Sequence, residues 1–186
     1  MRAPPGTGTV VSVVRVLARY RVALGGLMAA LTVWLSRPTA ASVILGAVLV
    51  GLGLALRLWA AGHVEKSREV TSSGPYRHTR HPLYLGSTLL GLGFAVAANH
   101  LWLGLAVVAY LAATLGAAIR AEEAHLREKF GDAYDAYAHR RVPPSDRRFS
   151  WARAIANREH HAVAGTLAGL SLLLIKVWYS QGFVGR

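Results

Sequence analysis

Two polar segments of this chain contain the residue types that bind small molecules or move protons. Residues 74–86 read GPYRHTRHPLYLG and place two histidines, two arginines and two tyrosines at the border of an apolar run. The second segment, 120–144, contains Glu122, Glu123 and the string FGDAYDAY. Polar and charged groups are costly to place at a membrane border. We therefore expect the two segments to meet and form one site.

The first segment has features of an anion or cofactor site. Pro82 fixes its own backbone and disfavours helix at His81, which predicts a helix that begins at or just after Pro82. The free amides of that first turn attract negative charge, and Arg80 and His81 stand just before it. Tyr84 offers a ring and a hydroxyl, and Gly86 leaves room for a ligand against the backbone. The alternative is a topological role, with arginines on lipid headgroups and tyrosines in an aromatic belt.

The acidic pair of the second segment lies at the C-terminal end of an apolar run. The helix dipole disfavours carboxylates there, so the presence of Glu122 and Glu123 indicates that a positively charged group compensates them. Arg120, the basic residues of the first segment or an organic cation would serve. Tyr134 and Tyr137 are three residues apart and share a helical face, which we expect to pack beneath the membrane.

Histidine pairs make a metal site an alternative. His78 with His81, or His160 with His161, could donate imidazoles to a metal ion. No HExxH or comparable spacing occurs, and the absence of cysteine excludes a Cys-based zinc site and a thiol nucleophile. We therefore assign no metal ligands and expect an organic zwitterion as the ligand.

The composition predicts a membrane protein. Of the 186 residues 53% are hydrophobic, whereas soluble chains contain roughly 45–50%. The formal charge of +12 would also suit a nucleic-acid-binding protein. Basic residues that flank apolar runs are what membrane topology requires, however. We expect an all-α, polytopic helical bundle in the membrane and no nucleic-acid partner.

Apolar runs predict about five membrane helices, at residues 22–36, 40–61, 83–98, 101–119 and 162–180. The two-residue break at Asn99 and His100 predicts an antiparallel hairpin. A helix outside the membrane is expected over 121–137, disorder over 1–9, and an amphipathic interfacial segment over 10–20. Small residues let membrane helices approach closely. We assign that packing role to the glycines at 51, 53, 91, 93, 165 and 169.

The basic residues orient these runs. Of the 21 lysines and arginines, all but Arg37, Lys176 and Arg186 belong to one side of the five-helix arrangement. The positive-inside rule places that side, with the N-terminus and both polar segments, in the cytoplasm. Arg57 lies near the end of its run, where we expect it to reach lipid headgroups.

At the residues described above, the chain resembles the isoprenylcysteine carboxyl methyltransferase family and its bacterial relatives, which include phospholipid methyltransferase-like proteins. The matching strings are GPYRHTRHPLYLG, the glutamates at 122 and 123, and LREKFGDAYDAYAHRRVP at 126–143. The resemblance implies a methyltransferase-like catalytic core at 74–143. Residues 1–73 would supply the interfacial segment, two membrane helices and a polar loop. Residues 144–186 would form a C-terminal extension with a fifth helix.

Members of that family are integral membrane enzymes that use S-adenosyl-L-methionine without a Rossmann domain. The resemblance therefore implies methyl transfer to a lipid-like or small hydrophobic carboxylate, thiol or amine. With the orientation given by the positive-inside rule, we expect a cytoplasmic site. The excess of arginine over lysine and the abundant alanine and glycine indicate a bacterial protein, and hence an inner membrane. It implies that Arg120, Glu123 and His81 are catalytic. The implied cofactor-binding residues are Arg80, His81, Tyr84, Gly86, Glu122 and Glu123.

Two other functions remain as alternatives. A sterol-reductase-like, NADPH-dependent membrane oxidoreductase resembles this chain around the Arg-His-Pro-x-Tyr-x-Gly string. That function needs extra Arg or Lys contacts for the 2′-phosphate and a proton donor for hydride transfer. The third hypothesis is a membrane scaffold without enzymatic activity.

Overall fold

The computed structural model describes residues 20, 23–66 and 68–184, and the regular secondary structure among these residues is helical. No strand occurs among them, so the all-α fold class is confirmed. The expected disorder over 1–9 and the interfacial segment over 10–20 lie outside the described residues, apart from Tyr20. The helices are Ala23–Leu35, α2 (Ala40–Ala61), the short 3-10 helix η1 (Gly74–Arg77), α3 (Pro82–Ala98), α4 (Leu101–Phe130), α5 (Asp132–Ala138), α6 (Trp151–Ala156) and α7 (Glu159–Val184).

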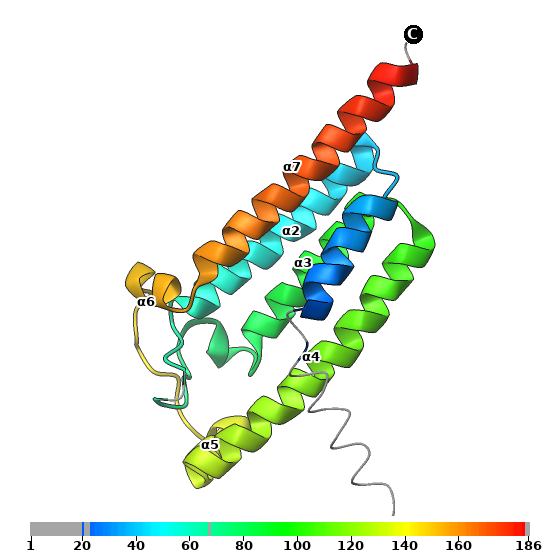
Figure 1. Cartoon of the computed structure of the whole chain (residues 1–186). Helices are drawn as coiled ribbons and strands as arrows, with labels where there is room; N and C mark the ends of the chain where they lie inside the picture. Colours follow the sequence, from blue (N-terminus) through cyan, green and yellow to red (C-terminus); the bar gives the residue numbers. More distant parts are fainter. Residues whose placement is uncertain (1–19, 21–22, 67, 185–186) are drawn as a thin grey trace, which may run out of the picture.

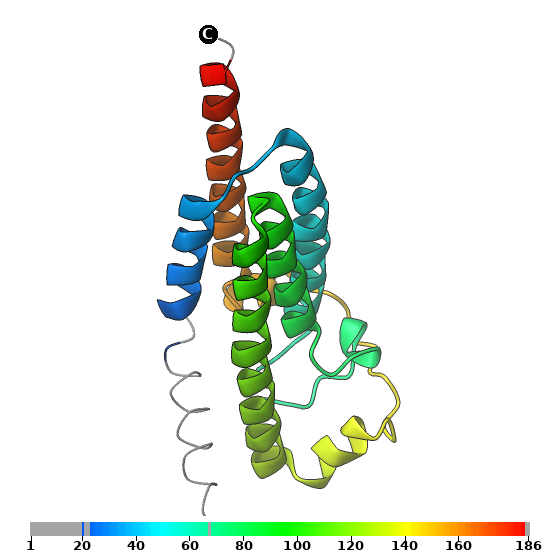
Figure 2. The ribbon, with the colours of Figure 1, turned by 90° about the vertical axis from the view of Figure 1, so that its right-hand side faces the viewer.

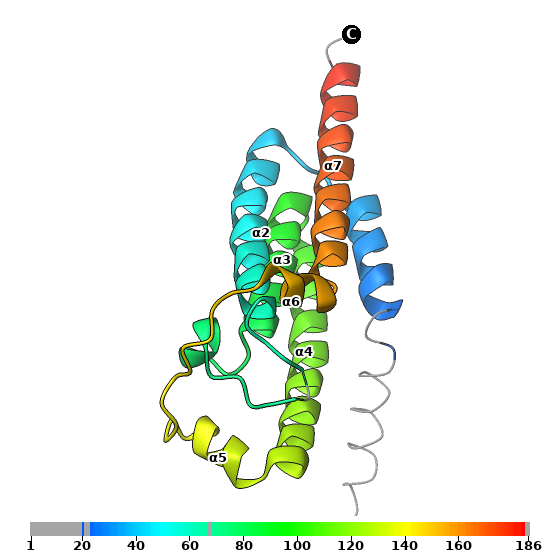
Figure 3. The ribbon, with the colours of Figure 1, turned by 90° about the vertical axis from the view of Figure 1, so that its left-hand side faces the viewer.

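The long helices run up and down beside one another, and the loops, α5 and α6 gather at one end of this bundle (Figures 1 and 3). Among the described residues α2, α4 and α7 contain apolar stretches long enough to cross a membrane. Helix Ala23–Leu35 and α3 are apolar but shorter. The membrane bundle agrees with the composition, while the count of five spans stays a prediction.

The turns around α3 follow their sequence signals. Pro82 is the first residue of α3, as its fixed backbone predicts. Asn99 ends α3 in the left-handed conformation with φ 48°, and the His100 side chain accepts a hydrogen bond from the Leu103 amide at 3.3 Å. The predicted hairpin between residues 83–98 and 101–119 is therefore confirmed.

One 30-residue helix, α4, carries the acidic pair beyond the bundle without a break. The chain bends only at Gly131, whose φ of 49° favours glycine. Helix α5 then turns away from the axis of α4 (Figure 2). The single helix expected over 121–137 is thus wrong in one respect, because it is split at Gly131.

Glycines let α2 and α3 pack at very short range. A Cβ on Gly53 would lie 2.7 Å from the Gly86 carbonyl oxygen, and one on Gly46 would lie 2.4 Å from that of Gly93. Such distances leave no room for a side chain, so the packing role expected for Gly53 and Gly93 is confirmed. It is wrong for Gly51, whose Cβ would meet nothing within 4 Å.

The remaining glycines with an expected packing role divide in the same way. A Cβ on Gly91 would lie 2.6 Å from Leu111, and one on Gly169 would lie 2.9 Å from Phe94. Gly165 has nothing within 4 Å of that position. Gly169 of α7 therefore allows close packing against Phe94 of α3. Of the two glycines in the small-xxx-small pattern of α7, Gly169 makes a close helix contact and Gly165 does not.

Helix Ala23–Leu35 is attached to the bundle at the end opposite the polar loops. Lys176 Nζ donates to the carbonyl oxygens of Val33 and Trp34 at 2.9 and 2.7 Å. At the same end the Arg37 amide donates to the Ala98 carbonyl oxygen at 2.8 Å. Arg37 and Lys176 thus lie away from the polar segments, as the charge pattern predicts.

Candidate active site

A cavity of about 700 Å³ opens at the end of the bundle where the two polar segments meet. Its wall comes from α2, α3, α4, α5 and α7, together with η1 and the loop before it. The size suits a small organic ligand, because such sites measure roughly 300–1,000 Å³. The wall contains five tyrosines, namely Tyr76, Tyr84, Tyr110, Tyr134 and Tyr137.

Glu123 joins the two polar segments at the edge of this cavity. Its Oε1 accepts a hydrogen bond from His81 Nε2 at 3.0 Å and lies 3.2 Å from Arg80 Nη1. Its Oε2 lies 3.5 Å from Arg127 Nη2. The side chains of His81 and Glu123 are 15% and 18% exposed, so this charge-assisted contact is partly shielded from water. The predicted meeting of the two segments is confirmed.

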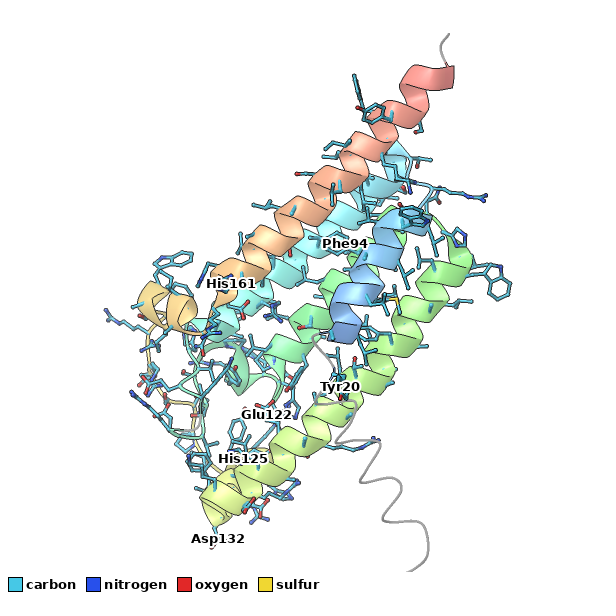
Figure 4. The ribbon with its side chains drawn as sticks, viewed as in Figure 1. Tyr20, Phe94, Glu122, His125, Asp132 and His161 are labelled. Atoms are coloured by element: carbon cyan, nitrogen blue, oxygen red, sulfur yellow. The ribbon has the colours of Figure 1, made fainter. Side chains whose placement is uncertain are left out.

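Glu122 and His125 face the cavity from α4 (Figure 4). Among the described residues, the ion pairs of the cavity region involve Glu65, Glu69, Glu123 and Glu159, and none involves Glu122. Glu122 therefore contributes an uncompensated negative charge to the wall. Arg120 is exposed and does not line the cavity.

Tyr84 and Gly86, near the start of α3, have different neighbours: Tyr84 faces the cavity, whereas Gly86 contacts α2. Tyr84 lines the cavity, with its ring centroid 5.9 Å from that of His81. Gly86 is buried, and a Cβ there would lie 2.6 Å from Arg57 Cγ and 2.8 Å from the Gly53 carbonyl oxygen. The absence of a side chain at Gly86 thus serves the contact with α2, and a direct contact between Gly86 and a cofactor stays a prediction.

The other histidines do not join this cluster. His78 is exposed and borders a separate hollow of about 390 Å³ together with Arg77. His160 and His161 stack at the start of α7 with ring centroids 4.2 Å apart, and both are exposed. Within the described part of the chain, no three His, Asp or Glu side chains are grouped to hold a metal ion.

Tyrosines of α5 attach that helix to η1. Tyr137 Oη donates to the Tyr76 carbonyl oxygen at 2.9 Å. Burial raises the pKa of Tyr137 to about 12 and raises the pKa of Tyr76 well above its usual value. Both phenols are therefore protonated at neutral pH. Tyr134 is 1% exposed, and its hydroxyl has no hydrogen-bond partner among the described residues.

Tyr137→Phe is expected to loosen η1 without changing the bundle. The variant loses one hydrogen bond, which lowers the free energy of unfolding by about 1 kcal/mol. Hydrogen–deuterium exchange of residues 74–79 should become faster, because η1 is then held less firmly. The matched control is Tyr179→Phe, at a side chain 61% exposed on α7. Equal exchange in both variants would contradict the structural role of the Tyr137 hydroxyl.

Arg57 and Glu159 belong to the cavity wall, although the sequence did not identify them as site residues. The expectation that Arg57 reaches lipid headgroups is wrong, because its Nη2 lies 2.7 Å from Glu159 Oε1. An arginine inside an apolar run was the available signal, since such residues commonly have a buried partner. Glu159 stands in the C-terminal extension, outside the segments that resemble a known family.

Fold and cavity together define an α-helical membrane protein with a polar site at one end of its helices. The model of the phospholipid methyltransferase family matches residues 41–133, which is half of the chain. The chain therefore belongs to this family, which also contains the isoprenylcysteine carboxyl methyltransferase-like proteins. The resemblance drawn from the sequence is confirmed.

A curated protein is also similar to this chain. The nickel-cobalt-cadmium resistance protein NccN of Alcaligenes xylosoxydans xylosoxydans is 31% identical over 123 residues, which cover 65% of this chain and 55% of NccN. The chain thus spans about half the length of this relative. No solved structure matches the chain.

Proposed function

We propose that the chain is an S-adenosyl-L-methionine-dependent methyltransferase that acts on a lipid-like or small hydrophobic acceptor. The observation that carries the proposal is Glu122, which forms no ion pair with any described residue, in a cavity whose wall contains five tyrosines. A carboxylate and aromatic faces attract an organic cation. The sulfonium of the cofactor is such a cation, and family membership supports methyl transfer.

Buried hydroxyl groups support a polar ligand of this kind. Tyr134 Oη and Thr71 Oγ1 lack hydrogen-bond partners among the described residues, and both residues line the cavity. A buried polar group without a partner is costly, so an orphaned hydroxyl at a cavity indicates a ligand group that completes it. The ribose and amino-acid parts of S-adenosyl-L-methionine offer such groups. We assign its binding to His81, Tyr84, Glu122 and Tyr134.

The chain's own residues would accelerate transfer mainly by positioning. The bound cofactor supplies an electrophilic methyl group. Glu123 holds His81 and Arg80, which fixes the position of these two residues in the cavity wall. Orientation of an acceptor in line with the methyl group removes a large entropic barrier. A carboxylate acceptor is already ionised at neutral pH, whereas an amine or thiol needs a base, for which His81 of the cavity wall is the candidate.

The charge of the cavity favours this cofactor over NADPH. Both arginines of the wall are paired, Arg57 with Glu159 and Arg80 with Glu123. A 2′-phosphate needs arginine or lysine groups that are not already bound to carboxylates. Among the described wall residues Lys66 is the cation outside these two pairs, and it is exposed.

Access and location follow from the same arrangement. We propose that the cavity faces the cytoplasm in a bacterial inner membrane, where the soluble cofactor can enter it. The separation of Arg37 and Lys176 from the other basic residues supports that orientation. A lipid-like acceptor would enter from the membrane side, because α2, α3, α4 and α7 supply part of the wall.

Calorimetric titration of the detergent-purified chain tests this function. S-adenosyl-L-methionine is expected to bind, and Glu122→Gln should weaken its binding by about tenfold. The same variant should affect the demethylated product less, because that molecule has no sulfonium charge. Glu128→Gln, at an exposed position of α4, is the control and should change neither affinity. Binding of NADPH but not of S-adenosyl-L-methionine would overturn the proposal.

A further inference from the structure

Arg57 and Glu159 form an ion pair in the cavity wall. Arg57 Nε donates to Glu159 Oε2 at 3.0 Å, and Nη2 donates to Oε1 at 2.7 Å. Nη1 donates to Ser87 Oγ at 2.5 Å. The side chains of Arg57 and Glu159 are 21% and 4% exposed. These groups come from α2, α7 and α3, and all of them line the cavity.

Packing alone does not account for a charge pair at this place. Burial removes both ions from water, and apolar residues of similar volume often stabilise a fold as well or better. Glu159 is favourably placed at the first residue of α7, where the helix dipole attracts negative charge. Arg57, in contrast, stands on an apolar helix and faces a cavity. Ionisable groups of that kind commonly belong to a substrate site.

The pair determines what the arginine can bind. A free guanidinium binds a carboxylate or phosphate through two parallel N–H bonds. Glu159 occupies the Nε and Nη2 edge of Arg57, and Ser87 takes a third N–H. Arg80, the other arginine of the wall, forms an ion pair with Glu123 through Nη1 alone, and its side chain is 46% exposed. An anionic head group therefore finds the two-bond edge of Arg57 occupied and meets the negative charge of Glu122.

We propose that Glu159 is a specificity-determining residue, which occupies Arg57 and thereby excludes acceptors with an anionic head group. The cavity then accepts hydrophobic molecules whose head group is uncharged or basic. This inference rests on the proposed function, because it concerns the acceptor of that reaction. It assigns a role in the site to the C-terminal extension, since Glu159 begins α7.

Two probes of equal chain length separate charge from shape. The detergent-purified full chain is titrated by calorimetry, without any cofactor, with decanoate and with the uncharged decanamide. The wild type is expected to bind decanamide about tenfold more tightly than decanoate, and Glu159→Gln should strengthen decanoate binding about tenfold while leaving decanamide unchanged. Glu128→Gln is the control, because Glu128 is exposed on α4 and lies outside the cavity wall. It should leave the preference unchanged.

Several outcomes would overturn the inference. They are a wild type that prefers decanoate or binds neither probe, and a folded Glu159→Gln variant that keeps the wild-type preference. If Glu159→Gln does not fold, Arg57→Met/Glu159→Met removes both charges together. This double variant should bind decanamide like the wild type and gain no decanoate binding. If the folded double variant loses decanamide binding, the Arg57–Glu159 pair only maintains the shape of the cavity, and the proposal is wrong. Failure of S-adenosyl-L-methionine to bind would instead overturn the proposed function and leave these titrations interpretable.

Discussion

Glu123→Gln is expected to weaken S-adenosyl-L-methionine binding by about 10- to 100-fold while the helical bundle stays folded. Glutamine keeps the size of the side chain but removes the charge that holds His81 Nε2 at 3.0 Å and Arg80 Nη1 at 3.2 Å. A hydrogen bond to a charged group contributes roughly 1.5–3 kcal/mol, which corresponds to this range of affinities. Without it, His81 no longer has a fixed position at the cavity. Calorimetry measures the affinity, and circular dichroism checks the fold.

A double-mutant cycle tests whether Glu123 acts through His81. His81→Ala should weaken cofactor binding by a similar factor, and the double variant should be little worse than either single variant, because both changes remove the same contact. Glu128→Gln lies on the same helix at an exposed position and should have no effect. Losses that add up in the double variant would mean that the two residues act independently.

The limits of α3 and the meeting of the polar segments were predictable, because they depend on local signals. Pro82 marks the start of α3, and Asn99 and His100 mark the turn before α4. An antiparallel hairpin returns the chain to the end from which it started. His81 at the beginning of α3 and Glu123 beyond the apolar part of α4 therefore had to lie at one end of the bundle. Their direct contact is a consequence of this topology.

The sequence suggests two different roles for Gly86, one from its place in the Arg-His-Pro-x-Tyr-x-Gly string and one from its spacing to Gly93. Because it follows Tyr84 in that string, Gly86 suggests space for a ligand. Gly86 and Gly93 are also seven residues apart on α3, as Gly46 and Gly53 are on α2. Residues at that spacing share one helix face. The structure places the two glycine faces against each other, so the role of Gly86 corresponds to this spacing rather than to its place in the string.

The Arg57–Glu159 pair could not have been predicted from local sequence. The two residues are 102 positions apart. An arginine near the end of an apolar helix can reach lipid headgroups or a buried partner, depending on how the helix is rotated about its axis. The close packing of glycines between α2 and α3 fixes that rotation. The position of α7 then supplies the carboxylate.

Gly53→Ala is expected to destabilise the bundle, whereas Gly51→Ala, two residues away on the same helix, is not. A Cβ on Gly53 would lie 2.7 Å from the Gly86 carbonyl oxygen and 2.8 Å from the Leu90 amide nitrogen. Backbone atoms cannot move aside like the end of a flexible side chain, so α2 and α3 must separate. Overpacking of this kind costs about 1–3 kcal/mol. A Cβ on Gly51 meets nothing within 4 Å, and alanine there should gain up to about 1 kcal/mol through helix propensity.

Unfolding of both variants in detergent, followed by circular dichroism, measures this difference. The separation of α2 from α3 should also reach the cavity, because Arg57 on α2 and Ser87 on α3 are joined by a hydrogen bond. Decanamide binding should therefore weaken in Gly53→Ala and stay unchanged in Gly51→Ala. Equal stability of the two variants would show that α2 and α3 tolerate a wider spacing. A destabilised Gly53→Ala that binds decanamide normally would instead separate helix packing from the shape of the site.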